Sequence, residues 1–254
     1  MNAICIIPFY LDMITITKAY REDIMKEPVY YYSCKERRQL LNFSNNLFEM
    51  MCKYPDSLHS IAILCIGTDK VTGDSLGPFV GHQIRKQLAS LNGTREKAFL
   101  PDIRIFGTLK NPVHAVNLEE TLETIKKDYK KKGIDFESCL LVVVDASLGY
   151  PNHLGCVTLT NQPLTPGEGV NKKLPQVGQI SVTGIIGEAR NSSYKSQLSL
   201  RHTKLSDLME LADFISDGIM DCLKRLYLHL SIVYRNGLPD GSHTFFLHNG
   251  KQQI

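Results

Sequence analysis

Two runs of apolar residues constrain the fold of this 254-residue chain more than any other feature. Residues 61–66 read IAILCI and residues 139–144 read CLLVVV, so neither run contains a charged side chain. Runs of this length that are rich in Ile, Leu and Val are typical of strands buried on both faces. Such strands occur almost only in parallel sheets that helices cover on both sides. The two runs therefore predict an α/β fold.

The rest of the chain alternates short strand patterns with amphipathic helical patterns. Strands are expected at residues 61–66, 102–106, 139–144, 155–160 and 179–186. Helices are expected at residues 35–53, 76–90 and 204–230, and a further one from residue 113 or 117 to residue 132. Parallel strands need helical crossovers, so this order predicts a three-layer α/β/α domain with a mainly parallel sheet and an antiparallel strand or hairpin near residues 155–186.

The domain boundaries are placed where the periodic spacing of apolar residues ends, near each end of the chain. We expect a partly ordered arm over residues 1–34, a single α/β domain over residues 35–232 and a C-terminal tail over residues 233–254. Two interpretations of the arm stay open: a pro-segment, or a chain that starts at Met13.

Composition excludes several classes of function. A net charge of +3 is too small to indicate nucleic-acid binding, and the lysines of residues 126–132 are typical of a solvated helix end. Seven cysteines without a CxxC pair indicate neither a disulfide framework nor a zinc site. The apolar N-terminus is too short to span a bilayer. We expect a cytoplasmic protein that needs no cofactor and binds neither a membrane nor nucleic acid.

Two aspartates are expected at the carboxyl edge of the sheet, where open α/β sheets bind ligands. Asp74 follows the first buried run through a glycine loop and begins a helical pattern, and Asp145 directly follows the second run. If the two strands are neighbours, their carboxyl groups meet at the carboxyl edge of the sheet. Two close carboxyl groups share one proton, so one can act as a general base and the other as a general acid. The simpler alternative is that Asp74 caps a helix and Asp145 caps a turn.

Other motifs compete with this interpretation. Residues 73–76 spell GDSL, the block that names a family of serine esterases, and Ser75 with His243 and Asp240 would form its triad. The seven residues from Gly67 to Gly73, and Asp74 after them, separate this serine from its strand, and no GxND block is present, so we rank the triad lower. No histidine pair has metal-ligand spacing, and we assign no metal ligand, although Asp74 and Asp145 could hold a metal ion if a third ligand came from elsewhere.

Three blocks in order resemble a known family. CIGTDKVTGDSLGP, VVVDASLG and TPGEGVNKKLPQVGQISVTGI are similar to blocks of the sporulation protein YyaC family, also called spore protease YyaC, over residues 35–230. That family is related to the germination protease, which degrades small acid-soluble spore proteins, and more distantly to hydrogenase maturation endopeptidases. The histidine that the latter use to grip nickel has no counterpart before Pro175.

The resemblance implies an aspartic-type peptidase of sporulating cells that acts on a protein or peptide, for example a small acid-soluble spore protein. It places the two essential aspartates of the germination protease at Asp74 and Asp145. It also implies a substrate-binding set made of Thr68, Gly73, Ser75, Gly167, Gly169, Asn171 and Lys172. Alternatively, a member of the family could keep the fold and the two aspartates but bind a protein partner without cutting it.

Overall fold

The computed structural model describes residues 28–58, 60–91, 101–166, 174–189 and 198–235. Its principal elements, in chain order, are β1 (Tyr30–Ser33), α2 (Arg37–Cys52), β2 (Ser60–Cys65), α3 (Leu76–Ser90), β3 (Asp102–Phe106), α4 (Leu118–Lys131), β4 (Leu140–Gly149), β5 (Cys156–Thr160), β6 (Ile180–Glu188) and α6 (Leu205–Arg235).

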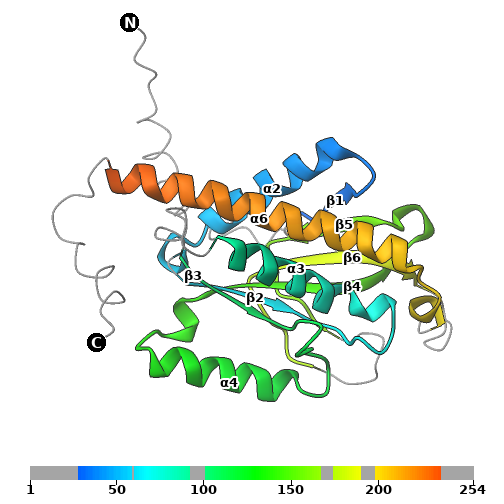
Figure 1. Ribbon diagram of the computed structural model, residues 1–254, viewed down its shortest axis with the longest axis horizontal. Helices are drawn as coiled ribbons and strands as arrows, with labels where there is room; N and C mark the ends of the chain where they lie inside the picture. Colours follow the sequence, from blue (N-terminus) through cyan, green and yellow to red (C-terminus); the bar gives the residue numbers. More distant parts are fainter. Residues whose placement is uncertain (1–27, 59, 92–100, 167–173, 190–197, 236–254) are drawn as a thin grey trace, which may run out of the picture.

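These strands form one sheet in the order β1-β5-β6-β4-β2-β3. The pairs β2–β3, β2–β4 and β4–β6 are parallel, whereas β5 runs antiparallel to both β6 and β1. Helices α2, α3 and α6 cover one face of the sheet and α4 covers the other (Figure 1). The predicted three-layer α/β/α fold with a mainly parallel sheet is therefore confirmed, as is the antiparallel strand near residues 155–186.

The core lies in two parts, one on each face of the sheet. Alternate residues of β4 divide between them: Val142 and Val144 pack under α2, α3 and α6, and Leu141 and Val143 pack with residues of α4. Strand β2 is completely buried along its length. Burial on both faces is the reason why these two strands read as continuous apolar runs in the sequence.

Strands β4 and β6 and helix α6 extend beyond their predicted ends, and one strand was not predicted. Strand β4 continues past residue 144 to Gly149, because β6 keeps pairing with it as far as Glu188 after β2 has ended. Residues Tyr30–Ser33, which the sequence analysis assigned to the arm, form edge strand β1 against β5. The tail from residue 236 onward lies outside the described residues.

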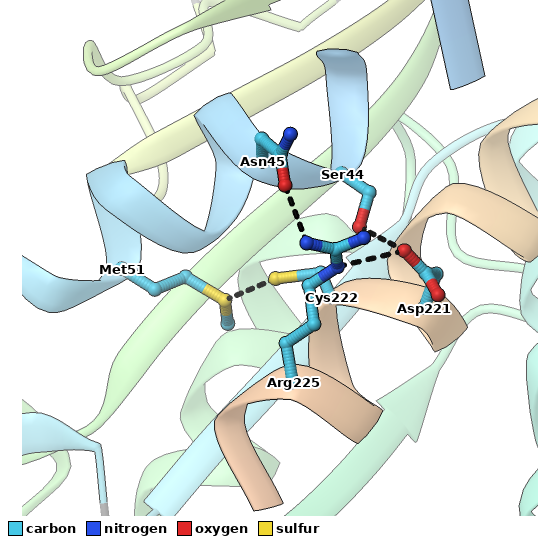
Figure 2. Close-up of polar contacts among 6 residues, drawn as sticks. All are labelled: Ser44, Asn45, Met51, Asp221, Cys222 and Arg225. Atoms are coloured by element: carbon cyan, nitrogen blue, oxygen red, sulfur yellow. Dashed lines mark hydrogen bonds and ion pairs between the residues drawn. The ribbon is translucent and has the colours of Figure 1, made fainter. Parts of the chain in front are cut away.

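Polar contacts join α6 to α2 above the sheet. Asp221 of α6 accepts a hydrogen bond from Oγ of Ser44 at 2.7 Å and pairs with Nε of Arg225 at 2.9 Å, and Arg225 also donates to Asn45 (Figure 2). The Cys222 thiol points toward the Met51 sulfur beside this cluster (Figure 2). Among the helices of the described residues, none is both long enough and apolar enough to cross a membrane.

Candidate functional site

The segment after β2 turns back on itself at Gly67. Its φ angle is +142°, and a Cβ atom at this position would lie 2.0 Å from the carbonyl oxygen of Asp74. Any side chain here would therefore clash with the backbone that carries Asp74. The Gly67 N–H donates to the carbonyl oxygen of Val113 at 2.7 Å, which ties the turn to the segment that follows β3.

Asp74 lies in a short 3₁₀ turn, Gly73–Ser75, that leads directly into α3. The Thr68 N–H donates to Oδ2 of Asp74 at 3.1 Å and to its carbonyl oxygen at 3.0 Å. Burial raises the pKa of Asp74 to about 6, against the opposing effects of the Thr68 N–H and of the charge on His114. A carboxyl group with this pKa is mostly ionised at neutral pH.

Asp145 lies inside β4, opposite Thr183 of β6 and one residue after Val144, which pairs with Cys65 of β2. Only 9% of its surface is exposed, and its Oδ1 accepts a hydrogen bond from the N–H of Ala146 at 2.8 Å. Burial raises the pKa of Asp145 well above its ordinary value, and the negative charge of Asp74 raises it further. Strands β2 and β4 are neighbours, which was the condition for the two carboxyl groups to meet at this edge of the sheet.

The different environments of the two groups separate their roles. Asp74 loses its proton first, near pH 6, and its negative charge then opposes ionisation of Asp145. The raised pKa of Asp145 favours its protonated form beside an ionised Asp74. This is the arrangement in which one carboxyl group can accept a proton and the other can donate one.

Gly73 joins this turn to a neighbouring cleft. A Cβ atom at Gly73 would lie 2.7 Å from Cδ1 of Ile186 and 2.8 Å from Oγ1 of Thr203. Ile186 and Thr203 both line a cleft of about 460 Å³ between the end of β6, the segment before α6 and the first turn of α6. The cleft carries apolar side chains such as Leu154 and charged ones such as Lys204. It adjoins the turn that carries Asp74.

Ser75 is buried, with 8% of its surface exposed, and its Oγ donates a hydrogen bond to the carbonyl oxygen of Thr72 at 2.6 Å. Its hydroxyl group thus closes the turn that holds Asp74. The other members of the esterase triad, His243 and Asp240, lie outside the described residues. The same holds for four residues of the predicted substrate-binding set: Gly167, Gly169, Asn171 and Lys172.

Sequence reasoning missed one residue of this site, His114. Val113 pairs with Ile66 at the carboxyl edge of the sheet, so His114 lies close enough for its charge to act on Asp74. No local pattern in the sequence identifies it, because His114 lies eight residues after the end of β3 and reaches this edge only through the bridge between Val113 and Ile66. Nowhere in the described part of the chain do three or more His, Cys, Asp or Glu side chains come together in a way that could hold a metal ion.

Comparisons with known proteins agree with the resemblance seen in the sequence. A family model described as "Protein of unknown function (DUF1256)" matches residues 31–218. The Bacillus subtilis (strain 168) protein named "Uncharacterized protein YyaC" is 34% identical over 159 residues, which are 63% of this chain and 67% of that protein. The crystal structure of a NiFe hydrogenase maturation protease, HycI from Thermococcus kodakarensis KOD1, aligns with a TM-score of 0.40 and 18% identity over 65% of this chain and 92% of that one. The expected kinship with YyaC is confirmed.

Proposed function

This chain belongs to the DUF1256 family, and we propose that it is an aspartic-type peptidase in which Asp74 and Asp145 hydrolyse peptide bonds of a protein substrate. One observation carries the proposal: the half-buried carboxyl group of Asp74 and the buried one of Asp145 come from different segments of the chain, both have raised pKa values, and the charge of Asp74 raises the pKa of Asp145. Charged or titratable pairs of this kind concentrate at functional sites.

In the proposed reaction the ionised Asp74 acts as the base and the protonated Asp145 acts as the acid, and the two roles are then reversed. The ionised Asp74 takes a proton from a water molecule whose oxygen attacks the peptide carbonyl carbon, while the protonated Asp145 gives its proton to the carbonyl oxygen. In the collapse of the tetrahedral intermediate the C–N bond breaks, Asp74 passes its proton to the leaving amine, and Asp145 recovers a proton from the hydroxyl group. Both carboxyl groups end in their starting states.

Other described residues have supporting parts in this proposal. The Thr68 N–H orients the base by its hydrogen bond to Oδ2 of Asp74. The absence of a side chain at Gly73 allows the turn to pack against Ile186, which also lines the neighbouring cleft, and the proposal places an extended peptide in that cleft. The buried Ser75 hydroxyl, which donates to Thr72, favours the aspartates over Ser75 as the reactive groups.

The substrate and setting are proposed from the sequence resemblance. The three blocks shared with the YyaC family and with the germination protease favour a small acid-soluble spore protein, met in the cytoplasm of a sporulating cell or forespore. The alternative is a sporulation protein that binds a partner through the same cleft without cutting it, because the cleft has both apolar and charged lining residues.

The test is digestion of purified small acid-soluble spore protein by the full chain, followed by mass spectrometry, with EDTA and a serine-directed inhibitor in parallel. The proposal expects defined fragments that neither reagent suppresses. Cleavage that EDTA abolishes would replace this mechanism with one that uses a metal ion. Cleavage that the serine reagent abolishes would favour Ser75. Stable binding of the substrate without any fragment would favour the non-catalytic alternative.

A further inference from the structure

Strand β4 continues past the point where β2 stops pairing with it. The last pair of residues is Cys65 with Val144, and the Ile66 N–H donates one further hydrogen bond to the Val144 carbonyl oxygen at 2.7 Å. Strand β4 goes on to Gly149 and pairs with β6 over this stretch. Residues 146–149 therefore have one side paired with β6, and a second side on which the described residues supply no strand partner.

The two aspartates accept the hydrogen bonds that would otherwise continue the ladder between β2 and β4. Beyond the last bond of this parallel ladder, the next donors would be the N–H groups of Ala146 and Thr68. The Ala146 N–H donates instead to Oδ1 of Asp145 at 2.8 Å. The Thr68 N–H donates instead to Oδ2 of Asp74 at 3.1 Å and to its carbonyl oxygen at 3.0 Å. Both carboxyl groups thus lie at the point where the two strands separate.

The end of β4 presents unpaired backbone groups on the side of β2. Successive residues of a strand direct their N–H and C=O groups to opposite sides. The Val144 carbonyl oxygen faces β2, whereas the Gly149 carbonyl oxygen faces β6, because it accepts the N–H of Ala189 at 2.9 Å. By this alternation Ala146 and Leu148 face the side of β2. The C=O of Ala146 and both backbone groups of Leu148 have no hydrogen-bond partner there among the described residues.

We propose that the substrate binds as an added strand along residues 146–149 of β4, beyond the end of β2. The cutting of this strand rests on the proposed peptidase function, whereas its binding does not. Unpaired sheet edges bind extended peptides through main-chain hydrogen bonds. Residues Leu140–Asp145 are buried but residues 146–149 are only half-buried, so solvent reaches this stretch. An added strand lies about 5 Å from its neighbour, so its peptide bonds would pass beside Asp145 and Asp74.

This edge selects the conformation of the substrate more than its sequence. The backbone groups of Ala146 and Leu148 recognise the main chain of an extended segment, so the substrate class is an unfolded or extended part of a protein. The cleft of about 460 Å³ lies on the other side of this stretch, since Gly187 and Glu188 line it and pair with β4 from β6. The cleft is then left to a part of the substrate further from the cut bond.

The test follows hydrogen exchange of the backbone amides by NMR in the full chain with the substitution Asp74→Asn, which removes the proposed base. In the free chain the Leu148 amide should exchange faster than those of Ser147 and Gly149, whose N–H groups face β6. The probe is purified small acid-soluble spore protein. Its addition should slow exchange of the Leu148 amide by about 10-fold or more, because the N–H gains an acceptor.

A substitution at Leu148 removes the donor and leaves the pairing with β6 in place. Leu148→Pro lacks the N–H on the unpaired side of β4, a position at which strands tolerate proline. In the Asp74→Asn chain it should weaken binding of the same probe, measured by calorimetry, by about 10-fold. Leu148→Ala is the matched comparison, because it keeps the N–H, and it should weaken binding by less than about 3-fold.

Unchanged exchange of the Leu148 amide in the presence of the probe, or equal losses of affinity in Leu148→Pro and Leu148→Ala, would overturn the proposal. The exchange measurement needs no substitution at Leu148, so it decides the matter if Leu148→Pro does not fold. Cleavage by the wild type together with unchanged exchange would reject the added strand and leave the peptidase function. Slowed exchange without cleavage by the wild type would refute the peptidase function and leave the binding edge intact.

Discussion

The negative charge of Asp74 raises the pKa of Asp145 beyond the effect of burial alone. Asp74 reaches this position through the turn at Gly67, whereas Asp145 belongs to the middle of β4. The parallel pairing of β2 with β4 brings the two segments together at one edge of the sheet. The proximity of the two carboxyl groups therefore depends on the order of strands in the sheet. Which group acts as the base and which as the acid depends on which of them has the lower pKa.

The pH dependence of cleavage should reflect the two carboxyl groups separately. The ratio kcat/KM should rise as the pH passes about 6, where Asp74 ionises, and should fall at higher pH when Asp145 loses its proton. A rate profile over the full range in which the protein stays folded measures both limbs. A rate that stays constant through pH 6 would contradict the assignment of Asp74 as the base.

Replacing the buried acid should stabilise the protein at neutral pH. The pKa of Asp145 is higher in the folded chain than in the unfolded chain, so its favourable contribution is complete below the unfolded pKa and is lost as the pH rises through the folded pKa. Asp145→Asn should therefore raise the free energy of unfolding at pH 7. The gain should disappear in acid, where the unfolded carboxyl group is protonated too.

Urea unfolding of wild type and Asp145→Asn at pH 7, and again at about pH 3, below the unfolded pKa of an aspartate, measures this difference. Asp69→Asn serves as the control, because Asp69 is exposed on the loop before Asp74 and should not change stability at either pH. A variant that is less stable than the wild type at pH 7 would show that the carboxyl group makes favourable interactions that burial does not explain.

Ser75→Ala should separate the structural role of this serine from a catalytic one. Its hydroxyl group donates to the Thr72 carbonyl oxygen inside the turn, so its loss should cost about 1 kcal/mol in the free energy of unfolding. Cleavage of a peptide substrate should continue at a rate close to that of the wild type. Complete loss of turnover in a folded Ser75→Ala chain would instead support the esterase-type triad.

The contact between α2 and α6 should depend on the charge of Asp221. Burial by itself would raise the pKa of Asp221, but the Ser44 hydroxyl and the Arg225 guanidinium outweigh it and lower the pKa below its ordinary value. The contribution of this group is therefore present above the unfolded pKa and is lost as the pH falls through the folded pKa.

Because the Asp221 side chain is partly exposed, Asp221→Asn should cost about 0.5–1 kcal/mol at pH 7 and nothing in strong acid. Thermal unfolding at both pH values measures the change, and Asp217→Asn, an exposed aspartate on the same helix, provides the comparison. An equal loss at both pH values would show that packing, rather than charge, accounts for the role of Asp221.

Much of this site could be predicted from local sequence, because it follows strands with a strong apolar signal. The buried runs at residues 61–66 and 139–144 identify β2 and β4, and the aspartates follow from them. The continuation of β4 through Ala146 to Gly149 had no such signal, since small and polar residues there are held by pairing with β6. The pairing of residues 146–149 with β6 joins segments that are far apart in the sequence, and it produces no periodic spacing of apolar residues in β4.

His114 was missed for a related reason. The sequence shows a lone histidine before a helix, which is more often a surface residue than a functional one. Its place beside Asp74 depends on β3 being the neighbour of β2, and on the bridge between Ile66 and Val113. The order of strands in the sheet, which local pattern does not determine, is what turns this residue into part of a site.

The central claim is tested most directly by the cleavage rates of Asp74→Asn and Asp145→Asn on one protein substrate that the wild type cuts. Both substitutions keep the size of the side chain and remove its ability to exchange a proton, so each folded variant should lose about 100-fold or more in turnover. Asp69→Asn should retain the rate of the wild type. Wild-type turnover in either pair variant would contradict the two-aspartate mechanism.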